Sequence, residues 1–127
     1  MKSKDTKPEM ILRHVLTDLG LRYRIHYKNL PGTPDVVFVS AKIAVFVHGC
    51  FWHKHSKCKT RLNLSKLSVE WQEKLNKCVD RDHRVVEELR LMGWQTLVIW
   101  ECEIKSTPVR CGRKIESKIE QRIIDNN

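Results

Sequence analysis

The densest group of chemically active side chains lies in one short segment, HGCFWHKHSKC at positions 48–58. Zinc in proteins is usually held by four soft or borderline ligands in a tetrahedron. Cys50, His55 and Cys58 could supply three of them from one tight loop. The spacing leaves His53 as an alternative to His55. A closed site of this kind would tie the segment to a distant part of the chain, and so restrict how the chain can fold.

The fourth zinc ligand has to come from elsewhere in the sequence. Cys102 directly follows an apolar run and is well placed, and Cys111 is the competitor. The five cysteines, in a chain without an export signal, favour metal ligation or burial over a disulfide framework. The alternative interpretation is a pair of buried thiols with histidines on a surface loop. Cys78 lies on the apolar stripe of a predicted helix, and we expect it in the core.

Length and charge set the broad class. A chain of 127 residues suits a single domain, 1–127, with one hydrophobic core. The net charge of +9 favours a polyanionic partner, either nucleic acid or an acidic surface. No apolar stretch is long enough to span a bilayer, and the start MKSKDTKPEM has no apolar region like that of a signal peptide. We therefore expect a cytoplasmic protein.

Hydrophobic periodicity predicts a helix-flanked mixed sheet with the element order α-β-β-β-α-β-α. Thr6 and Glu9 have capping-box spacing at the start of the first helix, and Gly20 and Gly93 are expected to end the two longer helices. In chain order, the predicted segments are a helix ending at 19, strands at 21–27, 35–39 and 42–47, a helix at 69–92, a strand at 94–100, and a short last helix containing Ile115, Ile119 and Ile123.

An acidic residue, Asp35, opens the second predicted strand directly after Pro34. Phosphodiester hydrolysis needs a hard cation, and a carboxylate on a rigid strand is a common anchor for it. If the strands 35–39 and 42–47 pair, Asp35 and His48 end near each other at one sheet edge. A histidine there, or His53 a few residues on, could serve as general base or acid. Asp after a turn is otherwise commonly a hydrogen-bonding residue.

Two adjacent large aromatics, Phe51 and Trp52, stand inside the cysteine- and histidine-rich segment. They cannot both point into the same core pocket. Such residues can enter a base stack as wedges, at an unstacking cost of roughly a few kcal/mol that is smallest at a mismatch. The alternative is that one belongs to the core and the other covers the zinc site.

Three segments closely resemble the very short patch repair (Vsr) mismatch endonucleases: LPGTPDVVF, VFVHGCFWHKHSKC and WQEKLNKCVDRDHRVVEELRLMGWQTLVIWEC. The resemblance runs from about Glu9 to Cys102. It implies an αβββαβ core of the PD-(D/E)XK nuclease type with a structural zinc site. It also implies nicking of one DNA strand 5′ to the T of a T:G mispair by Mg²⁺-dependent hydrolysis, in the repair of deaminated 5-methylcytosine.

The resemblance also assigns active-site roles. Asp35 matches the family's metal-binding aspartate, and Val47 falls where a main-chain carbonyl reaches Mg²⁺. His48 and His53 match the two active-site histidines, with His53 the better candidate for activating water. Glu9 matches an acidic residue whose side chain approaches the same site. The acidic residue and lysine that the generic nuclease fold places on its third strand are absent, and histidines take over there.

The same resemblance names the zinc ligands and the DNA contacts. Cys50, His55, Cys58 and Cys102 match the four zinc ligands. Phe51, Trp52 and Trp71 match aromatics that intercalate beside the mispair. Basic residues would flank this wedge and hold phosphates, namely Lys57, Lys59, Arg61 and Lys66. The implied partners are duplex DNA with a T:G mismatch and a mismatch-repair protein such as MutL.

Two departures from the family and two rival functions remain in view. The sequence begins eight residues before Glu9, where Vsr enzymes carry a longer arm that enters the minor groove, so weaker mismatch discrimination is expected. Cys78 stands where the family usually shows Asn. One rival function is a restriction or mobile-element endonuclease without mismatch specificity. The other is a non-catalytic, zinc-stabilised DNA-binding module, which would not need Asp35, His48 and His53 together.

Overall fold

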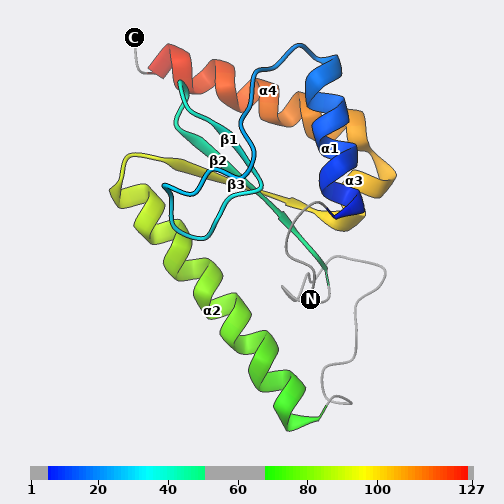
Figure 1. The fold of residues 1–127 in the computed structure, drawn as a ribbon, viewed down its shortest axis with the longest axis vertical. Helices are drawn as coiled ribbons and strands as arrows, with labels where there is room; N and C mark the ends of the chain where they lie inside the picture. The colour runs from blue at the N-terminus through cyan, green and yellow to red at the C-terminus, as the bar shows by residue number, and fades with distance from the viewer. Residues whose placement is uncertain (1–5, 51–67, 126–127) are drawn as a thin grey trace.

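The structure, a computed structural model, describes residues 6–50 and 68–125. The expected site residues between them lie outside the described part: Phe51, Trp52, His53, His55, Lys57, Cys58, Lys59, Arg61 and Lys66. The elements, in chain order, are α1 (Lys7–Asp18), β1 (Val36–Phe38), β2 (Ile43–His48), α2 (Val69–Leu91), β3 (Gln95–Trp100), α3 (Glu101–Ser106) and α4 (Pro108–Asp125) (Figure 1).

The described strands form a mixed sheet in the order β1-β2-β3. β1 pairs with β2 antiparallel, with Val36 opposite Val45, and β2 pairs with β3 in parallel, with His48 opposite Trp100. A parallel neighbour needs a long crossover connection, and the helix of that crossover is α2. The predicted class, a mixed sheet flanked by helices, is confirmed.

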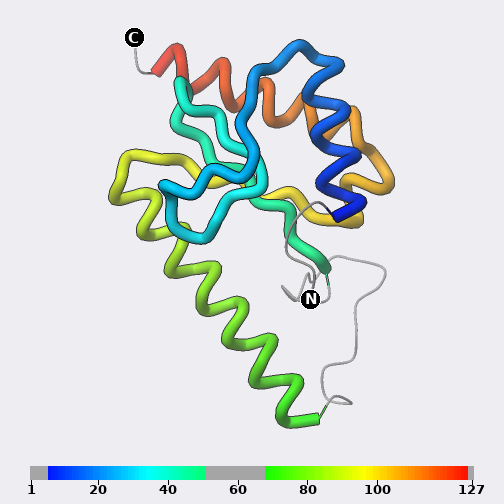
Figure 2. The backbone as a smooth tube through the Cα atoms, viewed as in Figure 1, coloured from blue at the N-terminus to red at the C-terminus, as the bar shows by residue number. Residues whose placement is uncertain are grey.

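Helices cover both faces of this sheet. The alternating side chains of β2 enter two different clusters, so β2 is buried on both sides. Ile43 and Val45 pack with residues of α1, α3 and α4, whereas Ala44 and Phe46 pack with Leu89 of α2. The first turns of α2 extend well beyond the sheet (Figure 2). None of the described helices has the length and apolar character needed to cross a membrane.

The predicted strand at 21–27 is wrong. Only an isolated antiparallel bridge joins Arg24 to Val37, through two main-chain hydrogen bonds of 2.9 Å. His26 has a φ of 55°, outside the β region, and this interrupts the extended conformation. The apolar alternation still has a structural meaning, because Leu21 and Tyr23 are partly buried against the larger core cluster.

The end of the chain also differs from the prediction. A separate helix, α3, begins directly after β3, and the last helix is the 18-residue α4 rather than a short one. Pro108 starts α4, where its missing N–H costs nothing. Cys111 and Ile115 are buried, but Ile123 is exposed, so the apolar spacing of four residues leaves the core before the helix ends.

The predicted helix ends are correct in position and partly wrong in detail. Gly20 and Gly93 both have positive φ, at 76° and 88°, directly after the C-caps of α1 and α2. Thr6 occupies the N-cap of α1, but its side chain makes no capping hydrogen bond. The Glu9 side chain turns instead toward Arg13 and Asp35, so the reciprocal capping box does not form.

Candidate active site

The turn before β1 brings Asp35 to the edge of β2. Gly32 and Thr33 both have positive φ in this turn. A Cβ atom on Gly32 would lie 2.5 Å from a methyl carbon of Val85, so this close approach to α2 requires glycine. The Asp35 N–H donates to the Val45 carbonyl at 2.9 Å.

The carboxylate of Asp35 is fixed by β2 itself. Its Oδ2 accepts a hydrogen bond from the main-chain N–H of Val47 at 2.6 Å. His48 is the next residue and the last of β2, so the expected approach of Asp35 and His48 at one sheet edge is confirmed.

A second acidic residue reaches this point from α1. Glu9 lies in the first turn of α1 and is only 4% exposed. Arg13, one turn later, donates from Nη2 to Glu9 Oε2 at 3.3 Å, which compensates part of the cost of burying the carboxylate. Glu9 also hydrogen-bonds with Asp35. Two carboxyl groups from different elements therefore meet beside β2.

The electrostatics of Asp35 reflect this crowding. Burial, together with the nearby Glu9 carboxyl, raises the pKa of Asp35 from 3.8 to about 8. The Val47 hydrogen bond and the charge of Arg13 oppose the rise. Without a cation, the ionised form of Asp35 is therefore unfavourable in this pocket. A bound divalent cation would favour the charged form instead.

His48 is nearly buried, at 8% exposed, and packs between rings and a carboxylate. Its Nε2 lies 4.0 Å from Oδ1 of Asp82 on α2. When the imidazole is protonated, these two side chains form an ion pair. The edge of its ring meets Trp100, with centroids 5.3 Å apart. Asp82 lies in the third segment that resembles the family, and its approach to His48 depends on how α2 crosses the sheet.

These residues line one cleft of about 570 Å³. Glu9, Asp35, Val47 and His48 form one part of its wall, and Asp82 joins them from α2. The cleft continues along the outer strand β3, where Thr96 and Val98 line it. The cleft contains carboxylate and carbonyl oxygens, a nearly buried imidazole and open space. Metal-assisted hydrolysis requires groups of these kinds.

Two of the four expected zinc ligands are described. Cys50 follows β2 and Cys102 lies in the first turn of α3, each two residues beyond the paired residues His48 and Trp100. Cys111, the competing ligand, belongs to the larger core cluster, and burial raises the pKa of its thiol. Cys78 is buried as expected. Over 6–50 and 68–125, no three His, Cys, Asp or Glu side chains group closely enough to hold a metal.

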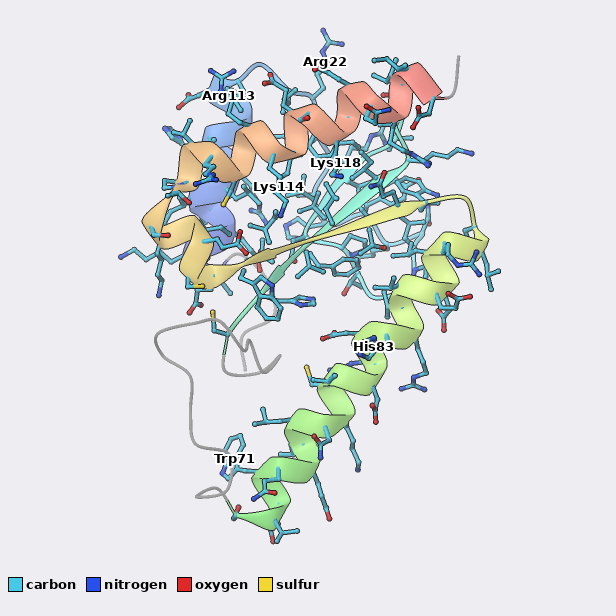
Figure 3. All side chains as sticks on the ribbon, turned by 180° about the vertical axis from the view of Figure 1, so that it is seen from behind. Arg22, Trp71, His83, Arg113, Lys114 and Lys118 are labelled. Carbon is cyan, nitrogen blue, oxygen red and sulfur yellow. The ribbon has the colours of Figure 1, made fainter. Side chains whose placement is uncertain are left out.

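One of the expected aromatic contacts is described. Trp71 lies in the first turn of α2, 40% exposed, and the Lys74 ammonium lies 5.1 Å from its ring centroid. Ser68 caps this helix, because its Oγ accepts from the Trp71 N–H at 3.3 Å. Figure 3 shows Trp71 at the far end of α2 from the sheet.

Comparison with known proteins gives consistent relatives. The family described as DNA mismatch endonuclease Vsr matches residues 1–60. The type II nicking enzyme V.XorIIP of Xanthomonas oryzae pv. oryzae is 43% identical, over 82% of this chain and 76% of that protein. The type II nicking enzyme V.NmeAIP of Neisseria meningitidis is 38% identical, over 94% of this chain and 84% of that protein. The DNA mismatch endonuclease Vsr of Escherichia coli K12 is 33% identical, over 95% of this chain and 77% of that protein.

A solved structure has the same fold. The catalytic domain of the homing endonuclease I-Bth0305I superposes with a TM-score of 0.61, over 94% of this chain and 99% of that domain. Its sequence identity of 19% supports the nuclease fold alone. The relatives named above, matched over most of their length, establish that this chain belongs to the Vsr family of DNA-cleaving endonucleases.

Proposed function

We propose that this endonuclease nicks one strand of duplex DNA 5′ to the T of a T:G mispair, the first step in repairing deaminated 5-methylcytosine. The single observation that carries the catalytic part is the hydrogen bond between Asp35 and Val47, which holds a carboxylate beside Glu9 and His48 in one cleft. The mismatch part rests on the sequence resemblance and on the relative from Escherichia coli.

The donor set in the cleft fits Mg²⁺. This ion prefers oxygen ligands and is usually held by one or two carboxylates, and Asp35 and Glu9 provide them here. Along a strand the N–H and C=O of one residue point to the same side, so the Val47 carbonyl faces the side of Asp35. When bound, the ion would polarise the scissile phosphate and lower the pKa of a water ligand.

The two histidines, His48 and His53, would transfer the protons. His48, packed against Trp100, would act as an acid or base whose protonated form Asp82 stabilises. Asp82 is then a positioning residue, because it acts through His48. His53 would activate the attacking water, and this assignment rests on the resemblance alone.

The remaining assignments concern DNA binding and folding. Phe51, Trp52 and Trp71 would open the base stack at the mispair, where unstacking costs least. Lys57, Lys59 and Arg61 would hold phosphates beside this wedge. A mismatch-repair protein such as MutL is the partner we would test first.

A structural zinc ion would be held by Cys50, His55, Cys58 and Cys102. The position of Cys50 and Cys102 just past the ends of two neighbouring parallel strands supports this set. Such a site would tie the segment after β2 to the start of α3.

The test is a nicking assay with purified protein, Mg²⁺ and two end-labelled duplexes that differ only in a T:G or T:A pair. We expect a nick 5′ to the mispaired T and little cutting of the T:A duplex. Equal nicking of both would replace the mismatch function with a general or sequence-specific nuclease. Binding without nicking would contradict the catalytic assignment.

A further inference from the structure

The last helix carries four of its five positive charges on one side. Arg110, Lys114, Lys118 and Arg122 follow one another at intervals of four residues along α4. Each interval turns about 40° around a helix, so the four side chains form one slowly winding stripe. The acidic Glu116 and Glu120 each come two residues after a lysine of the stripe, about 200° around the helix.

The members of the stripe differ in what they contact. Arg122 anchors the end of the helix, because its Nε donates to the Ala41 carbonyl at 3.1 Å and its Nη2 to the Gly93 carbonyl at 2.8 Å. Arg110, Lys114 and Lys118 are exposed, and within the described ranges none of them forms an ion pair.

Similar cations four residues apart repel one another along a helix, so this arrangement destabilises the free helix unless a polyanion lies against it. A solvated surface does not need such spacing. By contrast, Arg113 on the other flank of α4 is paired with Glu116, with Nη1 and Oε1 3.3 Å apart.

The stripe lies beside the outer edge of the sheet. Gly93, which Arg122 contacts, lies two residues before β3, and β3 is the edge strand of the described sheet. In Figure 3, Lys114 and Lys118 lie on the side of α4 toward β3, whereas Arg113 and Arg22 lie on the far side. β3 also borders the cleft through Thr96 and Val98. The cleft and the stripe therefore lie on opposite faces of the sheet, next to the same edge strand.

The stripe begins at Arg110, and this end is also close to the cleft in the chain. α4 follows α3 after the single residue Thr107, and Glu101, the first residue of α3, lines the cleft. Arg110 thus begins the stripe close to the rim, and Lys118 lies about 12 Å further along the helix axis. One DNA strand presents a phosphate about every 3.4 Å along the duplex axis, so this length faces several phosphates.

We propose that Arg110, Lys114 and Lys118 form an accessory contact for the phosphate backbone of the DNA that flanks the cleavage site. The occupant is duplex DNA because the chain belongs to a family of DNA endonucleases and the three exposed cations of the stripe form no ion pair within the described ranges. The contact carries no base specificity, and its effect is to increase affinity for long duplexes. The inference needs DNA cleavage but not mismatch recognition.

The experiment compares two double variants of the full chain that each remove two positive charges. K114Q/K118Q removes two members of the stripe, and R22Q/R113Q removes two exposed arginines from the opposite side. Binding is measured by fluorescence anisotropy as a function of salt. Two duplexes are used, a long one and a minimal one that ends one helical turn from the nick on each side.

For K114Q/K118Q on the long duplex, the slope of log affinity against log salt should become less steep by about two, since each lost lysine–phosphate contact contributes about one. R22Q/R113Q should keep the wild-type slope. The nicking rate at saturating DNA should be unchanged in both variants, and matching circular dichroism melts would show that both fold.

Equal slopes for the two double variants would overturn the proposal and reduce the effect to net charge. A wild-type slope for K114Q/K118Q would also overturn the proposal. An acidic protein surface would then be the alternative partner for the stripe. A wild-type enzyme that nicks T:A as well as T:G would defeat the mismatch function but leave this comparison intact.

Discussion

Asp35 and Val47, twelve residues apart in the chain, are joined by a hydrogen bond of 2.6 Å from the main-chain N–H to the carboxylate Oδ2. The bond fixes the carboxylate of the residue just before β1 against the neighbouring strand β2. It also leaves the Val47 carbonyl on the same side, so a strand and a turn together present oxygen donors to the cleft.

The first prediction concerns Asp35 in the metal-free protein. Its pKa is about 8 in the folded chain and 3.8 when unperturbed, so the folded state binds more protons between these values. Stability contributed by the protonated carboxyl is therefore lost as the pH rises through this window. Asp35→Asn keeps an acceptor for the Val47 N–H but cannot ionise.

In the presence of a chelator, the melting temperature of Asp35→Asn should rise relative to that of wild type as the pH increases from about 5 to about 8. At the upper end, Asp35→Asn should melt a few degrees higher, about the shift expected from 1–2 kcal/mol. Other titrating groups are common to both proteins, so the difference between the melting curves isolates Asp35. A constant difference over this pH range would contradict the burial argument.

The second prediction concerns the pair His48 and Asp82. Without the carboxylate 4.0 Å from Nε2, protonation of His48 becomes less favourable. Asp82→Asn should therefore move the limb of the pH–rate profile that belongs to His48 to lower pH, with DNA affinity retained. His48→Ala should lower the nicking rate by about two to four orders of magnitude.

Asp80→Asn is the matched control for Asp82→Asn, because Asp80 is exposed on the same helix. Its pH profile should equal that of wild type. If both Asp variants shift the profile equally, Asp82 acts through net charge rather than by positioning His48.

The third prediction concerns zinc. Purified protein should contain one zinc ion per chain, and a chelator should lower its melting temperature because the ion links separate parts of the fold. Cys102→Ser should lose zinc, whereas Cys111→Ser, in the core beside it, should retain it. Protein without zinc would refute the site, and retention by Cys102→Ser with loss by Cys111→Ser would reassign the ligand.

The fourth prediction concerns the contact of α1 with α4. A Cβ atom on Gly112 would lie 2.5 Å from Val15 Cγ1 and 3.0 Å from Leu19 Cδ1. Alanine normally stabilises a helix relative to glycine by about 1 kcal/mol, but overpacking costs about 1–3 kcal/mol. Gly112→Ala should therefore lower the free energy of unfolding, as measured in urea.

Ser117→Ala, on the exposed part of the same helix, should leave the stability nearly unchanged. Val15→Ala should be less harmful in the Gly112→Ala background than in wild type, because it vacates the space that the new methyl group needs. Additive effects of the two substitutions would argue against the close packing.

The sequence predicted the parts of the site that follow from local pairing. Asp35 and His48 belong to two strands joined by a short link, so antiparallel pairing brings them to one edge. The Asp82–His48 approach was not predicted, because it depends on the angle and height at which α2 crosses the sheet. Helical periodicity reports which face is buried and not which strand that face meets.

The errors in the fold have similar causes. The alternation at 21–27 correctly indicated partial burial of Leu21 and Tyr23, but the positive φ of His26 limits pairing to one bridge. α3 was missed because its six residues are too few for a periodic pattern, and it starts directly at the end of β3. Short elements of this kind are set by their tertiary contacts.

The most direct test of the catalytic site is single-turnover nicking in Mg²⁺ by Asp35→Ala, with DNA affinity measured on the same preparation. Asp18→Ala, which removes an exposed carboxylate at the end of α1, is the control. We expect Asp35→Ala to abolish nicking, to bind the duplex as tightly as wild type, and to differ from Asp18→Ala only in cleavage. Nicking by Asp35→Ala at the wild-type rate would contradict the proposed metal site and with it the assignment of the active centre.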